Sequence, residues 1–408
     1  MKRVRTAAAA VSVFFTSASN MKTIVWAFLT ALMAFLSTLP VETRDPSAPR
    51  RVDNPAHGPL SQTAHLRELW RVGDSEDDGE IFGEIADVVT DKEGNVFLLD
   101  RQTVDVRMFS REGKYLRSFG REGEGPGEFR RPVGLVVTPA NQIGVYQSNP
   151  LKLVLFDQQG TPAGDLNFEP DDGHPIQYLS RVQCGTDSFL VSGVDIASTP
   201  GAMSQNLRVM RFGKNGTFEC ELTRTERHFD FSRYVVRDDR PPRAVIDAAD
   251  AAYVSNNWNY EIERRPADCS TDLLIKRAYQ HRNRSRQEIE AIESYYRKGG
   301  GTRGATFNIA KVDPDIRWMA VDSKRRLWVL SSRGCVGQPA DSLGTFDVFD
   351  RAGKMLASVD MRGEGNFETD GYYLVGDRFY VLRSGKPAPG KTAGNPEPMS
   401  VICYELPI

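Results

Sequence analysis

Six arginines stand beside the ends of short apolar segments that read as β-strands, at corresponding places along the chain. They are Arg101, Arg131, Arg243, Arg317, Arg333 and Arg383. Converging guanidinium groups bind carboxylate, phosphate or sulfate through paired hydrogen bonds. Trp258 and Tyr178 occupy similar places and could add stacking surface. Two interpretations are open: a site for an anionic ligand, or arginines that each pair with a nearby acid such as Asp100, Asp238 or Glu84.

Oxygen-bearing side chains at similar places offer a second chemistry, the binding of a divalent metal ion. Glu84, Asp195 and Asn256 form the candidate set, with Asp100 and Asn257 as further members. Carboxylate and amide oxygens of this kind suit Ca²⁺ or Mg²⁺. Asp and Asn are also common turn residues, so the same set can be purely structural. No cofactor is predicted, and a divalent ion stays the alternative.

The usual catalytic and phosphate-binding motifs are missing from the sequence. No histidine or cysteine pair has metal-ligand spacing, and no nucleophile elbow is present, so no catalytic residue is assigned. The glycine-rich stretch 120–127 lacks the lysine of a phosphate loop and is not followed by a helix, so it reads as a linker. Cys403 falls within an apolar segment and is expected to be buried.

Internal repetition indicates how these residues are positioned. Five segments share one order of apolar strand, turn, strand, loop, strand, glycine turn and strand: 85–119, 133–168, 176–223, 243–279 and 316–361. Equivalent third strands end in Phe109, Phe156, Phe212 and Phe349, and equivalent turns contain Gly113, Gly160, Gly216 and Gly353. Repeats of this length are typical of a β-propeller, in which each repeat is one blade.

The sixth repeat is incomplete, because only three strands remain before the chain ends at Ile408. The segment Leu66–Val72 precedes the first full repeat and has no partner there. Pairing this segment with the last strand closes a ring of six blades and removes both open edges. The predicted fold is therefore an all-β six-bladed propeller closed by its N- and C-terminal strands.

The repeat and the linker at 120–129, followed by Pro132, resemble those of the NHL-related bacterial six-bladed β-propellers. The resemblance covers about residues 66–408 and implies the fold. Some propellers of this type are lyases that hold zinc through histidines, and lactonase propellers hold a divalent ion through Glu, Asn and Asp. The zinc pattern is not recoverable from the five histidines here.

Strand order predicts which face of the propeller carries the variable parts. In four-stranded blades the loops between second and third strands and the crossovers between blades lie on one face. The long segments 193–206, 280–315, 331–343 and 384–398 are all of this kind, and loops of such length are commonly functional. The six arginines are expected at the channel mouth on the same face, which is the predicted binding face.

One segment, 285–298 between blades 4 and 5, has helical periodicity. Ser285 and Glu288 form a capping box, and Gly299 can end the helix. Its apolar stripe consists of Ile289, Ile292, Tyr295 and Tyr296. The stripe either packs on the propeller or belongs to a lid or partner-binding helix with Gly299–Gly301 as its hinge.

The N-terminus indicates export. Basic residues precede two apolar runs, 7–15 and 24–36, and Met21 offers a second start. Residues 1–40 therefore read as a signal peptide or N-terminal anchor, residues 41–62 as a disordered linker, and residues 63–408 as the propeller. The predicted location is periplasmic or extracellular, with no membrane span in the mature chain.

The function predicted from these features is ligand or protein binding by an exported propeller. A net charge of −2 argues against nucleic acid as a partner, which leaves a protein, a peptide or an anionic small molecule, bound by a monomer. A metal-dependent enzyme of the lactonase or lyase type and a structural module of an envelope assembly are the alternatives. The five cysteines leave at least one thiol free, and their spacing assigns no disulfide.

Overall fold

The computed structural model describes residues 48–73, 81–199, 202–230, 235–237, 241–298, 306–384 and 399–407. The predicted signal peptide or anchor over 1–40, the glycines 299–301 and nearly all of the long segment 384–398 lie outside these residues. Among the residues described, no helix has both the length and the apolar character that crossing a membrane requires.

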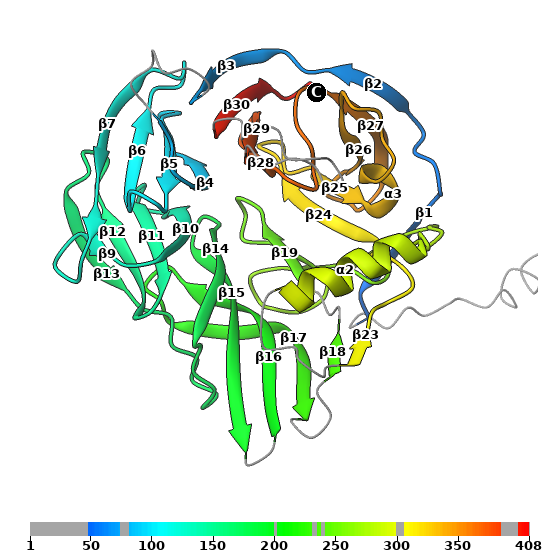
Figure 1. Ribbon diagram of the computed structural model, residues 1–408, viewed down its shortest axis with the longest axis horizontal. Helices are drawn as coiled ribbons and strands as arrows, with labels where there is room; N and C mark the ends of the chain where they lie inside the picture. Colours follow the sequence, from blue (N-terminus) through cyan, green and yellow to red (C-terminus); the bar gives the residue numbers. More distant parts are fainter. Residues whose placement is uncertain are drawn as a thin grey trace, which may run out of the picture. The chain divides into compact units, whose positions relative to one another are not determined.

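Short apolar segments joined by tight turns form antiparallel sheets that follow one another around a ring (Figure 1). The prediction of an all-β six-bladed propeller is confirmed. Blades 1 to 3 consist of β4 (Ile85–Thr90), β5 (Val96–Asp100), β6 (Asp105–Phe109) and β7 (Tyr115–Phe119); β10 (Pro132–Val137), β11 (Ile143–Ser148), β12 (Leu151–Phe156) and β13 (Pro162–Leu166); and β14 (Tyr178–Cys184), β15 (Ser188–Thr199), β16 (Ala202–Gly213) and β17 (Phe218–Asp230).

Blades 4 to 6 follow the same order. They consist of β19 (Arg243–Ile246), β20 (Ala252–Ser255), β21 (Glu261–Arg265) and β22 (Leu273–Arg277); β24 (Ile316–Val321), β25 (Leu327–Ser331), β26 (Ser342–Phe349) and β27 (Met355–Arg362); and β28 (Gly371–Val375), β29 (Arg378–Arg383), β30 (Ser400–Glu405) and β3 (Glu68–Val72). The connections contain α2 (Arg286–Lys298), α3 (Ser332–Cys335) and the short strand pairs β8 (Arg121–Glu122) with β9 (Glu128–Phe129), and β18 (Val235–Arg237) with β23 (Thr306–Asn308).

The two ends of the propeller close the ring as predicted. β3 lies antiparallel to β30, and Trp70 is the register partner of Cys403. The side chains from Ser400 to Tyr404 of β30 are buried. Cys403 is fully buried, in agreement with its position in an apolar strand. The terminal strands therefore leave no open edge at the junction.

Residues 50–65 differ from the prediction of a disordered linker over 41–62. β1 (Arg50–Asn54) lies parallel to β22, and β2 (Ser61–His65) lies parallel to β27. These strands are mostly exposed and polar, and an added edge strand needs only backbone hydrogen bonds, so its composition does not announce it. At the end of β1 the buried Asn54 binds both neighbouring blades: its Nδ2 donates to Lys276 O (3.0 Å) and Gly353 O (2.9 Å), and its Oδ1 accepts from Met355 N (2.7 Å).

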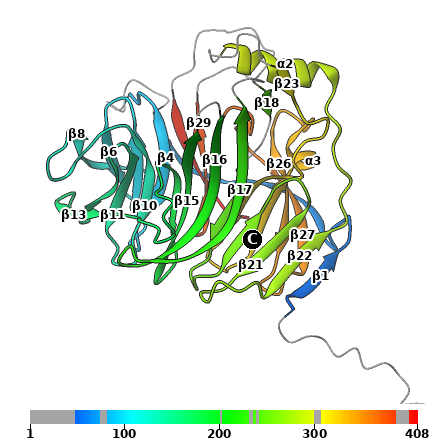
Figure 2. The ribbon, with the colours of Figure 1, turned by 90° about the horizontal axis from the view of Figure 1, so that it is seen from below.

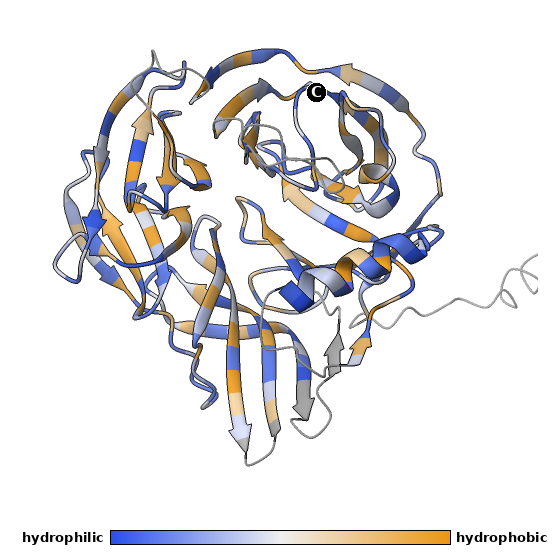
Figure 3. Cartoon of the chain, in the orientation of Figure 1, coloured by the Kyte–Doolittle hydropathy of each residue, from blue (hydrophilic) through white to orange (hydrophobic). Residues whose placement is uncertain are grey.

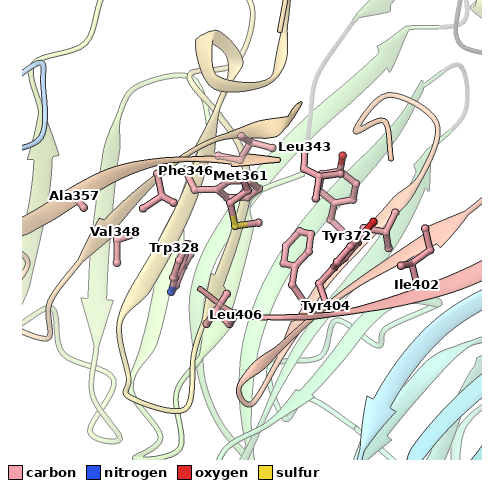
Figure 4. Packing of buried hydrophobic residues seen from close by; sticks show 14 residues of the cluster. Trp328, Leu343, Phe346, Val348, Ala357, Met361, Tyr372, Ile402, Tyr404 and Leu406 are labelled. Atoms are coloured by element: carbon pink, nitrogen blue, oxygen red, sulfur yellow. The ribbon is translucent and has the colours of Figure 1, made fainter. Parts of the chain in front are cut away.

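Apolar side chains fill the spaces between neighbouring blades. Figure 3 shows hydrophobic and hydrophilic residues alternating along the strands, as expected for sheets packed face to face. Between blades 5 and 6 the cluster includes Trp328, Phe346, Ile402 and Tyr404 (Figure 4). The four repeat phenylalanines are all buried, and each follows a register shift where its strand pairs with the outermost strand. Phe109 and its equivalents thus mark one repeated bulge.

Turn glycines are required where one blade touches the next. Gly113 has φ +85°, and a Cβ on it would lie 2.6 Å from the Trp70 ring in the neighbouring blade. A residue with a side chain would be both strained and in collision there. The glycine recurs in this turn because the turn packs against the adjacent blade.

Blade 3 is longer than the other blades. In the segment 193–206, predicted as a loop, residues 193–199 instead continue β15 and residues 202–206 belong to β16, and β17 follows them to Asp230. A disulfide joins Cys220 of β17 to Cys269 between β21 and β22, and so ties blade 3 to blade 4. Cysteine spacing alone could not reveal this pairing, because it depends on which blades are adjacent.

Candidate functional site

The connections on one face of the propeller form a cleft. α2 lies in the crossover from β22 to β24, and α3 lies in the connection from β25 to β26. Figure 2 shows α2 at one end of the blades. Both connections line the same cleft, which agrees with the predicted common face for these two of the four long segments. We call this the crossover face.

Local sequence sets where α2 begins. Ser285 N donates to Glu288 Oε2 (2.7 Å), and Glu288 N donates to Ser285 Oγ (3.2 Å). This is the predicted capping box, and it satisfies two backbone donors that the first turn would leave unpaired. The prediction of a helix at 285–298 is confirmed by the observed bounds Arg286–Lys298.

Charged side chains hold both ends of α2. Before the helix, Arg282 pairs with Asp313 and Glu288, and Arg284 Nε donates to Asp313 Oδ1 (2.7 Å). In the last turn of the helix, the Arg297 guanidinium lies 4.1 Å from the centre of the Phe307 ring on β23. The helix is therefore fastened at its ends rather than along its length.

The apolar stripe of α2 does not pack into the propeller core. No residue of α2 is buried, and the Tyr295 side chain is 75% exposed. Figure 3 shows a hydrophobic patch on this otherwise hydrophilic helix. Ala291, Ile292, Tyr295 and Tyr296 line a cleft of about 760 Å³. Ile289 of the predicted stripe lies instead on a second hollow, with Lys311.

The opposite wall of the cleft comes from blades 5 and 6. It consists of residues 335–340, Ser342 and Leu343 after α3, and residues 365–368 in the next crossover. On its floor the Arg317 guanidinium lies 5.5 Å from the centre of the Phe367 ring and 3.2 Å from a carboxylate oxygen of Glu368. Two basic and three acidic side chains line the cleft (Arg284, Arg317, Glu288, Asp313 and Glu368), so it is not an anion trap.

Cys335 is the one thiol that lines this cleft. Burial raises its pKa to about 12, so the group is a neutral thiol at physiological pH. A thiol is a poor nucleophile and a poor metal ligand. The chemistry that the cleft supports is therefore non-covalent contact with an apolar or aromatic group, with hydrogen bonding at its polar edges.

The six predicted arginines do not converge on one point. Arg317 lines the cleft. Arg101 lies 3.5 Å from Glu84, and Arg383 lies 3.2 Å from Asp370, as the acid-pairing interpretation expected for Arg101. Arg333 donates to the backbone oxygens of Gln280 (2.7 Å) and His281 (3.1 Å). Arg131 and Arg243 are exposed beside the starts of β10 and β19.

The two predicted aromatic residues also lie apart from the cleft. Tyr178 begins β14 and is 53% exposed. The backbone of Trp258 donates to Asn256 Oδ1 (3.1 Å) in a turn after β20. Neither residue lines the cleft under α2.

The candidate metal ligands are engaged by other groups. Asp195 is buried and accepts from Asn206 Nδ2 (2.7 Å), with the buried Arg208 beside it. Asn256 accepts from Trp258 as described, and Glu84 is beside Arg101. Within the described part of the chain, no three His, Cys, Asp or Glu side chains lie in a group that could hold a metal ion.

A smaller cavity of about 230 Å³ lies along the inner strands of the blades, in the central channel. The charged residues that line it are Asp87 on β4 and Arg181 on β14. The sequence analysis did not single out either residue. The available signal was a charged residue within an otherwise apolar first strand of a repeat, in IADVVT and YLSRVQC.

Comparisons with known proteins identify the same fold. Residues 77–175 match the model of the family DUF5128, described as a 6-bladed beta-propeller. No curated protein matches the sequence.

Solved structures with a similar course of the chain include both enzymes and other proteins. A virginiamycin B lyase from Staphylococcus aureus is 10% identical, with TM-score 0.39 over 83% of this chain and 98% of the lyase. A putative exported protein from Bacteroides fragilis is 11% identical, with TM-score 0.42 over 87% and 98% of the two chains. The calcium-binding protein regucalcin from Agrobacterium tumefaciens is 12% identical, with TM-score 0.38 over 85% and 97%. Likeness of this degree says nothing about what this chain binds.

Proposed function

We propose that the chain is an exported binding propeller that takes a small ligand with an apolar or aromatic body in the cleft under α2. The observation that carries this proposal is the apolar stripe of α2, in which no residue is buried and Tyr295 is exposed. Apolar residues left accessible on one side of a helix favour a partner, and here the half-buried Ile292 and Tyr296 line an open cleft with Tyr295. Its volume is within the range of about 300 to 1,000 Å³ that is usual for small-molecule sites.

The polar residues of the cleft would orient the ligand. Asn366 and Gln338 lie on the wall opposite α2 and offer amide donors and acceptors. Arg317 offers a guanidinium that Glu368 already partly neutralises. A single carboxylate on the ligand can compete for this arginine, whereas a multiply charged anion would be repelled by Glu288 and Asp313.

Export is part of the proposal. The basic residues and apolar runs of the N-terminus support it, and so does the Cys220–Cys269 disulfide, because disulfides persist in oxidising compartments. The repeat pattern supports kinship with the NHL-related propellers, and the protein would then act in the periplasm or outside the cell.

Ligand screening with matched variants tests the cleft. A library of small aromatic and apolar compounds is screened by thermal shift, and the compounds that stabilise the protein are titrated by calorimetry. Tyr295→Ala and Ile292→Ser remove cleft contacts and should weaken binding by about tenfold each, which corresponds to about 1.4 kcal/mol. Gln287→Ala, an exposed residue of α2 outside the cleft, should leave binding unchanged. Hits that bind all three variants like the wild type would contradict the assignment.

A further inference from the structure

The inner strands of four blades carry the same bulge at the same place. In blades 1, 2, 3 and 5 the register of the first strand shifts immediately before Asp87, Gly134, Arg181 and Trp318. A bulge re-aims the following side chain. These positions are therefore structurally equivalent and form one layer of the channel, in which Asp87 supplies an acid and Arg181 a base. The Trp318 ring packs against Phe346 and Phe379 between blades 5 and 6.

Gly134 makes room for two polar side chains of this layer. A Cβ on Gly134 would lie 2.4 Å from Asp87 Oδ2 and 2.2 Å from the Tyr146 hydroxyl. Any side chain at this position would displace both groups. The glycine therefore allows the Asp87 carboxyl and the Tyr146 hydroxyl to lie close together against its backbone.

Backbone amides hold Asp87 in place. Its Oδ1 accepts from Val88 N (3.0 Å), and its Oδ2 accepts from Leu135 N (2.8 Å) of the next blade. Burial raises the pKa of Asp87, and the nearby charges of Arg181 and Arg101 oppose that shift. Burial and the Asp87 charge both raise the pKa of Tyr146 and of Tyr373, whose hydroxyl donates to Ala86 O (3.0 Å).

Arg181 is the charged residue of this layer whose side chain is available to a ligand. Its guanidinium makes no hydrogen bond or close ion pair with any residue that the structure describes, although it lines the same cavity as Asp87. A guanidinium with free donors beside a carboxyl of raised pKa favours a ligand that brings one negative charge. The space, about 230 Å³, corresponds to about eight water molecules at ~30 Å³ each.

We propose that the channel layer around Asp87 and Arg181 binds a small monocarboxylate, with its carboxylate on the Arg181 guanidinium. This site is separate from the cleft under α2. Asp87 limits the charge of the ligand. A carboxylate on the ligand can lie beside Asp87 only while the Asp87 carboxyl is protonated, because two ionised carboxylates repel each other. Doubly charged anions such as phosphate are disfavoured by the same carboxyl.

The proposal predicts a pH dependence with a definite sign. Protonated Asp87 is compatible with a neighbouring anion, and ionised Asp87 repels it. Since burial raises the pKa of Asp87, affinity should be highest at low pH and fall as pH rises through that raised value. The other groups that face Asp87 are Arg181, Arg101, Tyr146 and Tyr373, and the pKa of each tyrosine is raised further above its ordinary value.

Titration of the full chain with acetate and butyrate, followed by NMR from about pH 5 to about pH 8, tests the proposal. Wild-type affinity should fall as pH rises. Arg181→Met should lose at least about tenfold in affinity, and Asp87→Asn should bind at least as tightly as the wild type without the pH dependence. Arg117→Met, an exposed arginine on the outer strand β7, serves as the control and should not change binding.

Several results would overturn this assignment. One is equal affinity of Arg181→Met and the wild type for the acids. Another is no binding of either acid to the folded protein. A third is tighter binding of phosphate, or of the zwitterion alanine, than of acetate. An unchanged pH dependence in Asp87→Asn would overturn the role of Asp87. None of these variants touches the cleft under α2, so this test and the test of the cleft fail independently.

Discussion

Buried ionisable residues in this propeller link neighbouring blades. Asp347 on β26 is nearly inaccessible and accepts from Tyr260 Oη (2.6 Å), Arg277 Nη1 (2.7 Å) and Ser358 Oγ (3.0 Å). Burial raises the pKa of Asp347, and the Arg277 charge opposes the rise. Two of these partners lie in blade 4 and one in blade 5, so the cluster joins the blades where apolar packing alone would allow sliding.

Asp347→Ala should therefore be among the costly substitutions in the chain. It leaves the largely buried Arg277 without its carboxylate partner, and breaking a buried charge pair from one side costs about 3 to 5 kcal/mol. Urea denaturation measures the loss in the free energy of unfolding. Asp165→Ala removes an exposed partner of Lys152 and should cost less than about 1 kcal/mol; equal costs for the two variants would contradict the role given to Asp347.

Single residues could be predicted from the sequence where every blade needs the same residue type at the same position. Phe109, Gly113 and their equivalents could be placed because the same packing problem recurs in every blade. The arginine site could not be placed, because whether Arg101 meets Glu84 or a ligand depends on side-chain geometry that strand position leaves open. Asp87 and Arg181 were missed for a related reason: a bulge, invisible in a single sequence, turns them into the channel.

At the scale of the element, two exposed polar strands extend blades 4 and 5. β1 and β2 cover the outer edges of β22 and β27, which would otherwise present unpaired backbone groups to solvent. Their composition indicated a linker, because edge strands exposed to solvent carry little apolar patterning. Asn54 is the anchor that sequence alone could not identify.

Asn54→Ala should loosen this edge. The substitution removes three hydrogen bonds and leaves buried backbone groups of both blades without partners, so we expect a loss of about 2 to 3 kcal/mol. Hydrogen exchange should quicken in residues 50–54 and in β22, while blades 1 and 2 stay unchanged. Asn141→Ala, a turn residue on blade 2, offers a comparison, and uniform acceleration in both variants would rule out the local account.

α2 shows how far sequence reasoning reached for the site. Its start and length were predicted from Ser285, Glu288 and the apolar spacing. Its surroundings were not, because the cleft wall is built from residues 335–343 and 365–368, which lie far along the chain. The stripe left a choice between packing and binding, and the exposure of Tyr295 favours binding.

For the whole molecule, ring closure and the disulfide determine stability together. β3 pairs with β30, so closure of the ring depends on residues more than three hundred positions apart, such as Trp70 and Cys403. The ring could be predicted because the incomplete sixth repeat and the spare strand at the start complement each other. The disulfide adds a second closure between blades 3 and 4.

Replacing Cys220 and Cys269 by serine should destabilise the propeller. The disulfide closes a loop with a sequence separation of 49, for which loop-closure entropy gives an upper value of roughly 4 kcal/mol, so a loss of about 2 to 4 kcal/mol is expected by urea denaturation. In exported wild-type protein, alkylation after unfolding should label three cysteines, namely Cys184, Cys335 and Cys403. Five labelled cysteines would contradict both the disulfide and the proposed export.

The most direct measurement is a hydrogen-exchange footprint of a compound found by the cleft screen. Our account predicts slower exchange in α2, in residues 335–343 and in residues 365–368 when the compound is bound, with little change in the turns at 91–95 and 110–114 on the opposite face. Protection of those opposite turns, or no protection of α2 at saturating compound, would contradict the claim that this propeller binds its ligand in the cleft on the crossover face.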